Sequence, residues 1–578
     1  MTPYLRACTL AVALPFAAGA ENPTPDWTGL WMAERVFGPR IEGTLLLRDR
    51  GGALVADIAG FEIPVKVSGD TYAFALPDEK GSFRGRRVGA AITGFWTQER
   101  TVTGGVRFAT PVTLRRDGAS WRGEVTPTED RFSYFLPVTR TAEGRLATYL
   151  RNPERNDGVF AQVQTLSIDG DKAALVGNRR GRKDTAPLFE GRVADGAFTL
   201  SMRGGSYDFA SVSDEASSVF YPRGKSPARY RYERPLQRED GWATASPEDV
   251  GMSREMLAAF VQKIIDTPMA AVGSSQIHSV LIARHGKLVL EEYFHGEHRD
   301  HPHDTRSAAK SLASVLVGAA MQAGIKVGPE TPVYETMLGT LPPGLEPKKR
   351  AMTLEHLLMM RGGHFCDDGN DDAPGNENRM QDPDENKEND WYRFILALPM
   401  DRTPGEKTIY CSIDAHLAGG VLAKAAGEPW AELFDRLVAR PLQFGRYHLF
   451  LAPTGEAYTG GGARLIPRDF LKIAQLMVDD GVWHGQRILS KEWARKSTAA
   501  LHDLTPRQQY GYLWNSVAYP YRGKTVRAFF AAGNGGQIFM GIPDLDLAIA
   551  FTGGNYADAA LFIPQRVLVP EQILPAIK

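Results

Sequence analysis

The chain has 578 residues, of which 43% are hydrophobic and 23% charged, a composition that excludes a disordered protein and is typical of a folded globular one. Its length exceeds one ordinary core and predicts two or three domains. With 67 basic and 68 acidic residues, the formal net charge is −1, so the charge balance gives no indication of a nucleic acid or an anionic membrane as partner.

The first twenty residues are typical of a secretory signal peptide. Arg6 supplies a positive charge, Leu10–Phe16 an apolar stretch, and residues 18–20 a small-residue cleavage site. The apolar stretch is too short to span a bilayer, and Arg6 just before Cys8 argues against a lipoprotein. We therefore expect residues 1–20 to be removed and the mature chain to be secreted or periplasmic, without a membrane span.

Residues 24–235 predict an all-β domain, either a sandwich or a barrel. Short runs of alternating or β-branched residues recur there, and Gly, Asp and Pro separate them. Residues 236–246 lack periodicity and indicate a linker. The expected strands are Gly43–Leu47, Ile63–Val67, Tyr72–Leu76, Ala91–Trp96, Val159–Ile168 and Phe198–Met202.

Residues 247–578 show a different pattern, in which strands at both ends enclose a mainly helical stretch. This order predicts one sheet built from distant parts of the chain. A hairpin is expected at His278–Ala283 and Lys287–Tyr293, and a helix capped by Asp304 follows it to Ala323. Further helices are expected at Thr353–Met360, Trp391–Leu398, Ala415–Ala426, Pro467–Asp479 and Pro564–Ile577, and strands at Tyr512–Val517, Thr525–Ala531, Gln537–Ile542 and Leu547–Thr552.

Ser307 and Lys310 lie three residues apart at the head of the helix that follows the hairpin. Residues i and i+3 share one face of a helix, so the amine can reach the hydroxyl. A serine becomes a nucleophile when a base takes its proton, and a lysine that burial has made neutral can be that base. Because Ser-x-x-Lys occurs about once by chance in a chain of this length, the pair needs support from other stretches.

Five stretches in a fixed order supply this support. They are His278–Gly318; Met352–Leu358 with Arg361–Gly363; Pro404–Glu406 leading to Tyr410–Ser412; Gly460–Gly462 leading to Pro467–Asp469; and Gly533–Gln537. On these stretches, residues 246–578 resemble the serine hydrolases related to class C β-lactamases, penicillin-binding proteins and 6-aminohexanoate-dimer hydrolases. The resemblance implies an antiparallel sheet flanked by helices, with a helical subdomain, and it does not extend to the β-rich N-terminal region.

The resemblance also implies the roles of the site residues. Ser307 is expected to be the nucleophile, Lys310 its partner base, and Tyr410 the residue that shares proton transfer. The backbone N–H groups of Ser307 and Gln537 are expected to bind the oxyanion. This chemistry needs no metal and no other cofactor, so none is expected.

Two positions depart from the family's usual pattern. Asn534-Gly535-Gly536 replaces Lys-Thr-Gly and removes a positive charge that helps bind a substrate carboxylate, and Ser412 replaces the Asn of Tyr-x-Asn. We expect all four residues in the substrate-binding part of the site. Both changes favour a small-molecule ester or simple amide over a lactam. The alternatives are a D-Ala-type peptidase, a penicillin-binding protein or β-lactamase, and a non-catalytic binding protein on this scaffold.

Cys366 and Cys411 are the cysteines of the mature chain, and a disulfide between them is expected in an oxidising compartment, with two free core thiols as the alternative. Ten acidic side chains follow Cys366 within residues 367–390. We interpret this segment as a solvated acidic loop near the pocket mouth that disfavours anionic substrates. A calcium site is the alternative.

Other kinds of catalytic site find no support in the sequence. No Gly-x-Ser-x-Gly elbow occurs, so an α/β-hydrolase triad is not indicated. Three histidines lack the spacing of a metal-binding set, and core or surface positions are expected for them: His356, His364 and His416.

Overall fold

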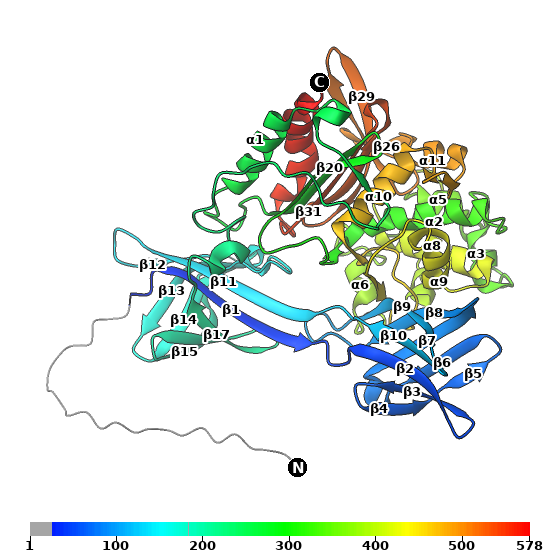
Figure 1. The fold of residues 1–578 in the computed structure, drawn as a ribbon, viewed down its shortest axis with the longest axis horizontal. Helices are drawn as coiled ribbons and strands as arrows, with labels where there is room; N and C mark the ends of the chain where they lie inside the picture. Colours follow the sequence, from blue (N-terminus) through cyan, green and yellow to red (C-terminus); the bar gives the residue numbers. More distant parts are fainter. Residues whose placement is uncertain (1–25, 183) are drawn as a thin grey trace.

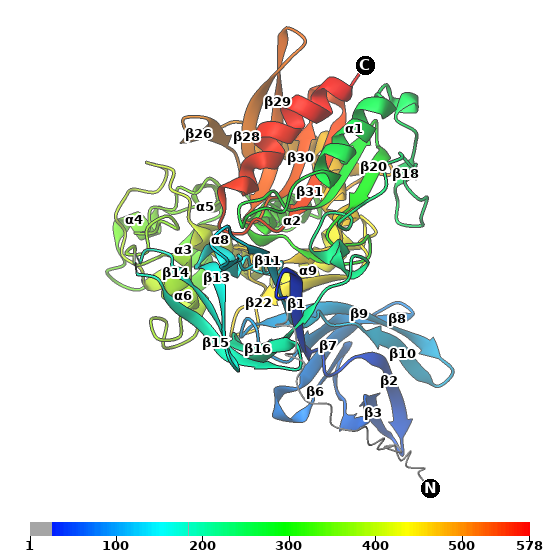
Figure 2. The same ribbon diagram turned by 90° about the vertical axis from the view of Figure 1, so that its left-hand side faces the viewer.

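The computed structural model describes residues 26–182 and 184–578, so the expected signal peptide at residues 1–20 lies outside the described residues. The N-terminal part forms two β-rich units, and the rest of the chain forms a sheet covered by helices (Figures 1 and 2). Among the described residues, no helix has both the length and the apolar character needed to cross a membrane.

The first unit is a closed β-barrel, which confirms the barrel among the expected all-β folds. Trp31, Phe198, Phe209 and Tyr207 pack inside it, since alternate side chains of each strand point to the barrel core. In order around the barrel its strands are β1 (Gly29–Gly38), β11 (Asp130–Arg140), β12 (Leu146–Ala147), β13 (Ala161–Asp169), β14 (Lys172–Arg179), β15 (Ala186–Ala194), β16 (Ala197–Met202) and β17 (Gly205–Ser211).

The second unit is an antiparallel sheet inserted between the first two barrel strands. Its core contains Trp96, Leu45, Leu114 and Phe83. The sequence pattern did not separate this sheet from the barrel, because both have the same alternation and the same turn residues. In order across the sheet its strands are β4 (Phe61–Pro64), β3 (Ala53–Ile58), β2 (Gly43–Arg50), β10 (Ser120–Val125), β9 (Arg107–Asp117), β8 (Ala91–Gln98), β7 (Gly81–Val88), β6 (Thr71–Ala75) and β5 (Lys66–Ser68).

This inserted sheet continues by hydrogen bonding into the C-terminal region. Strand β22 (Tyr447–Leu451) pairs with β9, β23 (Arg464–Leu465) pairs with β22, and β21 (His303–Asp304) pairs with β23. Beside this ladder, the hydroxyl of Thr110 lies 2.7 Å from Nδ1 of His448. The N-terminal sheet is therefore connected, strand by strand, to the residues just before Ser307.

The C-terminal region contains one sheet of nine strands, as its order of elements predicts. All neighbouring strands are antiparallel except β18 and β20. In order across the sheet they are β18 (Ala243–Thr244), β20 (Lys287–Tyr293), β19 (Ile277–Arg284), β31 (Leu547–Gly553), β30 (Gln537–Ile542), β29 (Lys524–Gly533), β28 (Asn515–Tyr521), β27 (Gln508–Tyr510) and β26 (His502–Thr505).

Helices cover both faces of this sheet. Leu281 and Ala283 of β19 pack with the central helices, whereas Val280 and Ile282 pack on the opposite face. The second face is covered by α1 (Arg254–Ile265) and the C-terminal helix Pro564–Ile573 (Figure 2). The other helices are α2 (Lys310–Gln322), α3 (Val333–Leu338), α4 (Pro347–Arg350), α5 (Leu354–Leu358), α6 (Glu377–Gln381), α7 (Trp391–Ala397), α8 (Ser412–Ala426), α9 (Trp430–Phe434), α10 (Pro467–Val478) and α11 (Lys491–Ser497).

The expected linker at residues 236–246 packs along the sheet. Arg468 is fully buried and donates hydrogen bonds to the Leu236 carbonyl and the Asp240 carboxylate, each at 2.7 Å. The same guanidinium pairs with Glu291 of β20. A buried arginine needs such partners, so it holds this segment against the C-terminal region. The domain limits at residues 235 and 247 stay a prediction.

Candidate active site

Ser307 lies in a 3₁₀ turn, residues Arg306–Ala309, that leads directly into α2. The backbone of Arg306 is left-handed, with φ of +48°. For a residue with a long side chain, such a conformation costs on the order of 1 kcal/mol or more and persists only where surrounding contacts impose it. The Asp304 carboxylate accepts a hydrogen bond from the Arg306 N–H at 2.8 Å. Asp304 therefore fixes the turn, rather than capping α2 as expected.

Lys310 is the first residue of α2 and is 1% exposed. Its Nζ donates a hydrogen bond to Ser307 Oγ at 2.8 Å and another to the Gly460 carbonyl at 2.5 Å. The i, i+3 spacing thus places the two groups in contact, as the sequence predicts. Gly460 belongs to the Gly460–Gly462 stretch. The residues of this stretch did not predict that one of its backbone carbonyls would bind Lys310.

Tyr410 lies on the other side of the Lys310 ammonium. The Lys310 Nζ is 5.1 Å from the centre of the Tyr410 ring, within the range of a cation–π contact. Tyr410 comes just before the start of α8, so the first turn of that helix positions it. The structure therefore brings Ser307, Lys310 and Tyr410 together.

The charges around Lys310 oppose the effect of burial on its pKa. Burial alone lowers the pKa of Lys310, but Tyr410, Glu377 and Asp368 outweigh it and raise the pKa above its ordinary value. As an ammonium, Lys310 can donate a hydrogen bond to Ser307 and stabilise negative charge beside it. Its part as the base that takes the Ser307 proton stays a prediction.

The end of β29 packs tightly against the turn that carries Ser307. A Cβ on Gly533 would lie 2.2 Å from the Thr305 carbonyl oxygen and 3.1 Å from the Ala308 nitrogen, so only glycine permits this approach. Gly535 and Gly536 follow with φ of +99° and +94°, which lets the chain turn into β30.

The side chains of Asn534 and Gln537 lie in different surroundings. Asn534 lines the cavity beside Ser307, and its side-chain oxygen accepts a hydrogen bond from the Ala557 N–H at 2.7 Å. The Gln537 side chain is fully buried and donates to the Gly553 carbonyl at 2.7 Å. Gln537 can thus serve the site only through its backbone, as expected for an oxyanion donor.

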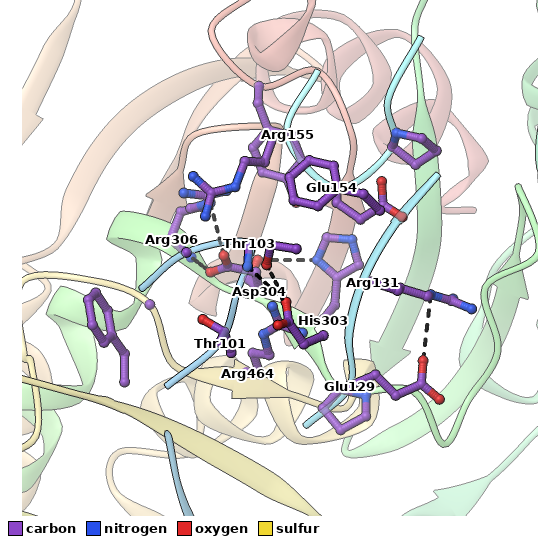
Figure 3. A pocket seen from close by; sticks show the side chains of 18 of the residues that line it. Thr101, Thr103, Glu129, Arg131, Glu154, Arg155, His303, Asp304, Arg306 and Arg464 are labelled. Carbon is purple, nitrogen blue, oxygen red and sulfur yellow. Dashed lines mark hydrogen bonds and ion pairs between the residues drawn. The ribbon is translucent and has the colours of Figure 1, made fainter. Parts of the chain in front are cut away.

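A cavity of about 660 Å³ opens in front of Ser307. Its C-terminal side includes Ser307, Asn534, Tyr458 and Tyr556. Its other side comes from the N-terminal β-rich units, and Figure 3 shows these side chains facing the cavity together with His303, Asp304, Arg306 and Arg464. The N-terminal residues labelled there are Thr101, Thr103, Glu129, Arg131, Glu154 and Arg155.

The sequence did not reveal this contribution of the N-terminal region. Arg131 forms ion pairs with Glu34 at 3.8 Å and with Glu129 at 3.5 Å, so its positive charge is balanced within this wall of the cavity. Arg155 forms no ion pair with a described residue, and burial together with repulsion from Arg306 lowers its pKa. The wall therefore offers both charged and polar groups to a substrate.

Comparison with known families identifies the C-terminal part. The family model described as beta-lactamase matches residues 261–557, which is just over half of the chain. The chain belongs to the β-lactamase family. This region therefore has the β-lactamase fold, and the turn at Ser307 and the strand at Gln537 both lie within it.

Individual proteins are similar to parts of this chain. A 6-aminohexanoate-dimer hydrolase of Paenarthrobacter ureafaciens is 25% identical over 265 residues, which are 44% of this chain and 64% of that protein, less than two thirds of its length. A family VIII carboxylesterase structure is 15% identical, covers 55% of this chain and 94% of its own, and has a TM-score of 0.42. A penicillin-binding protein homologue from Caulobacter crescentus is 14% identical, with coverages of 53% and 92% and a TM-score of 0.41.

Ser412, at the position of the β-lactamase family's asparagine, does not line the cavity. It is fully buried, and its hydroxyl donates to Asp368 at 2.6 Å and lies 3.1 Å from Glu377. The neighbouring Cys411 is joined to Cys366 by a disulfide, with their Cα atoms 6.0 Å apart. Together these contacts fasten the acidic segment to the start of α8 instead of placing Ser412 against a substrate.

The acidic segment of residues 367–390 is therefore only partly solvated. Glu377, Asn378 and Gln381 line the cavity, and the Tyr458 hydroxyl donates to Glu377 at 2.6 Å. Burial and the neighbouring Glu377 raise the pKa of Asp368 to about 6, against the opposing charge of Lys310. Two carboxylates thus lie next to the Lys310 ammonium and keep it charged.

Changing Asp368 to Asn is expected to alter the pH dependence of stability. The folded-state pKa of about 6 exceeds the ordinary value, so the folded state binds the proton more tightly and the free energy of unfolding falls as the pH rises from about 4 to 6. Asn resembles the neutral acid, so the variant should lose this slope and gain on the order of 2 kcal/mol at pH 7.5. Urea unfolding at pH 4.5 and 7.5 measures both effects.

Asp371 provides the matched control, because it is exposed in the same segment. Its change to Asn should leave the pH slope as in the parent chain. An unchanged slope in the Asp368 variant would contradict the raised pKa of that carboxyl.

The three histidines expected in structural positions have local partners or packing. His356 Nδ1 accepts a hydrogen bond from the Thr353 N–H at 3.1 Å at the start of α5, and the His364 ring bonds the Tyr334 hydroxyl at 2.9 Å. His416 stacks on Tyr392 with ring centres 4.5 Å apart. None of the three belongs to a potential metal-binding group among the described residues.

Proposed function

We propose that this member of the β-lactamase family is a serine hydrolase that cleaves ester or simple amide bonds through an acyl-Ser307 intermediate. The 2.8 Å hydrogen bond from Lys310 to Ser307, at the edge of a cavity and beside Tyr410, is the observation that carries the proposal. A buried ammonium bonded to a serine hydroxyl favours the negative charge that develops when the hydroxyl loses its proton.

In the proposed acylation, Tyr410 acts as a phenolate beside the Lys310 ammonium. Ser307 Oγ attacks the substrate carbonyl carbon, and its proton passes to the Tyr410 oxygen. The leaving oxygen or nitrogen takes that proton as its bond to the carbonyl carbon breaks. Water then attacks the acyl-Ser307 ester by the same route and releases the acid. Lys310 remains an ammonium that orients Ser307 and stabilises charge on the neighbouring oxygens, and the backbone N–H groups of Ser307 and Gln537 bind the oxyanion.

The proposed substrates are small esters or simple amides. Asn534, in place of a lysine, lines the cavity and offers no charge to a lactam carboxylate. The named activity of the Paenarthrobacter ureafaciens relative is the hydrolysis of a small amide dimer, which supports the amide part of this class. A cavity of about 660 Å³ has room for a substrate of that size.

We also propose that the enzyme works outside the cytoplasm. The disulfide between Cys366 and Cys411 supports this location, because disulfides persist in oxidising compartments. The location agrees with the expected signal peptide, which lies outside the described residues.

A substrate panel tests this function. The purified protein is offered p-nitrophenyl acetate and butyrate, small p-nitroanilides and nitrocefin at pH 7.5. We expect kcat/KM to be at least tenfold higher for the best ester or amide than for nitrocefin. Faster hydrolysis of nitrocefin, or stable labelling by a fluorescent penicillin, would support the lactamase or peptidase alternative. Ligand binding with no turnover of any member would support the binding-protein alternative.

A further inference from the structure

Two buried histidines and a carboxylate converge on one point beside the cavity. Nδ1 of His278 and Nε2 of His303 are 2.9 Å apart, and Nδ1 of His278 is 3.9 Å from a Glu297 oxygen. The three ligand atoms all lie within 4.8 Å of one another. Both histidines are buried, with relative exposures of 2% and 6%. We propose that His278, Glu297 and His303 bind a divalent transition-metal ion, of which Zn²⁺ fits best.

The fold brings these residues together from separate elements. His278 is on β19 of the central sheet, His303 is on β21, and Glu297 lies in the loop between β20 and β21. Residues 295–303 contain four histidines and one glutamate, a local density of ligating side chains that the sequence analysis passed over. His303 lies close to the turn of Ser307, and Figure 3 shows it at the cavity.

The donor set matches zinc chemistry. Two imidazole nitrogens and one carboxylate oxygen are a common zinc-binding set, with bond lengths of about 2.0–2.1 Å. Ligand atoms around such an ion are about 3.3 Å apart. The observed separations are 2.9 Å, 3.9 Å and, for the third pair, no more than 4.8 Å, so the side chains need to adjust by up to about 1.5 Å. Three protein ligands leave a fourth position for water, and all three residues line the cavity through which an ion and water can enter.

Neighbouring groups orient two of the ligands, His303 and Glu297. His303 Nδ1 lies 3.1 Å from the Asp304 carbonyl oxygen, so this nitrogen carries the proton and Nε2 is left as a lone pair. His301 Nδ1 lies 2.5 Å from the second Glu297 oxygen and orients the carboxylate.

Without a metal ion, His278 and His303 must share a hydrogen bond. His303 Nε2 has no proton of its own, so His278 must donate its Nδ1 proton to it, and the second nitrogen of His278 then has no partner among the described residues. A metal ion would take the place of the proton between the two histidines, and it would also bind the Glu297 carboxylate. It would also connect β19 to the segment just before Ser307.

Metal binding by the intact protein tests the proposal without relying on its activity. The protein is freed of metal with a chelator and titrated with Zn²⁺ by calorimetry in the presence of a competing chelator, and with Co²⁺ by absorption spectroscopy. We expect one ion per chain, visible d–d bands with Co²⁺, and a higher melting temperature with Zn²⁺, because an ion that binds only the folded state stabilises it.

Variants distinguish the site from surface binding. Glu297→Gln and His303→Gln should each weaken Zn²⁺ binding at least tenfold, whereas His298→Gln, at an exposed position of the same loop, should bind as the parent chain does. Circular dichroism of the metal-free variants checks that they are folded. No stoichiometric binding by the parent chain, or equal losses in the His298 and Glu297 variants, would overturn the proposal.

Discussion

Replacing Ser307 with Ala is expected to abolish turnover of every substrate that the enzyme accepts. If acyl-Ser307 is the intermediate, the variant has no nucleophile, and kcat should fall on the order of 10⁶-fold, as for other serine hydrolases that lose this group. The side chain removed is small and lies at the cavity edge, so the free energy of unfolding should change by less than about 1 kcal/mol. A fluorophosphonate probe should label the parent chain and leave the variant unlabelled.

Ser311→Ala is the matched control for this experiment. Ser311 lies on the same helix, is 1% exposed, and donates its hydroxyl to the Leu513 carbonyl at 2.6 Å, away from the cavity. This variant should lose stability but keep both labelling and turnover per folded molecule. Probe labelling that persisted without Ser307 would refute its role as nucleophile.

Replacing Lys310 with Ala should have the second largest effect. The change removes the donor to Ser307 Oγ and the positive charge beside Tyr410, so kcat should fall on the order of 10³-fold or more while KM changes little. It also leaves the Gly460 carbonyl unbonded and two neighbouring carboxylates without their counter-charge, so the protein should be less stable. Steady-state kinetics and the rate of probe labelling measure the catalytic part.

Lys349→Ala is the matched control, because it removes a lysine charge away from the active site. Lys349 donates to the Leu396 carbonyl at 2.9 Å and does not line the cavity. Its removal should leave kcat/KM within about threefold of the parent value. A Lys310 variant with equally mild kinetics would show that the ammonium does not assist Ser307.

Local sequence rules predicted the centre of the site. The i, i+3 spacing of Ser307 and Lys310 fixes their contact wherever a helical turn forms, and the ordered stretches placed Tyr410 beside them. Ser412 was assigned wrongly to the cavity side, because its environment depends on two carboxylates 35 and 44 residues away in sequence. The acidic side chains of residues 367–390 were visible in the sequence, but their position beside Lys310 depends on the tertiary fold.

The fold was predictable where a helix or strand has a clear apolar face in its own sequence. The strands and helices of the C-terminal region agree with their expected ranges within a few residues, because each buries a clear apolar face. The N-terminal wall of the cavity was not predictable. Arg131 and Arg155 reach the cavity through the docking of whole units, and no local spacing records that arrangement.

The ladder β9–β22–β23–β21 has a consequence for how the protein folds. It pairs Arg107–Asp117 with Tyr447–Leu451, more than three hundred residues later in the chain, so the chain must close a very long loop before these strands can pair. Folding of the segment before Ser307 therefore depends on an early part of the chain that has no family motif. During synthesis, the start of β9 at Arg107–Ala109 lacks its partner until β22 has emerged, and an unpaired stretch of strand edge is prone to aggregation.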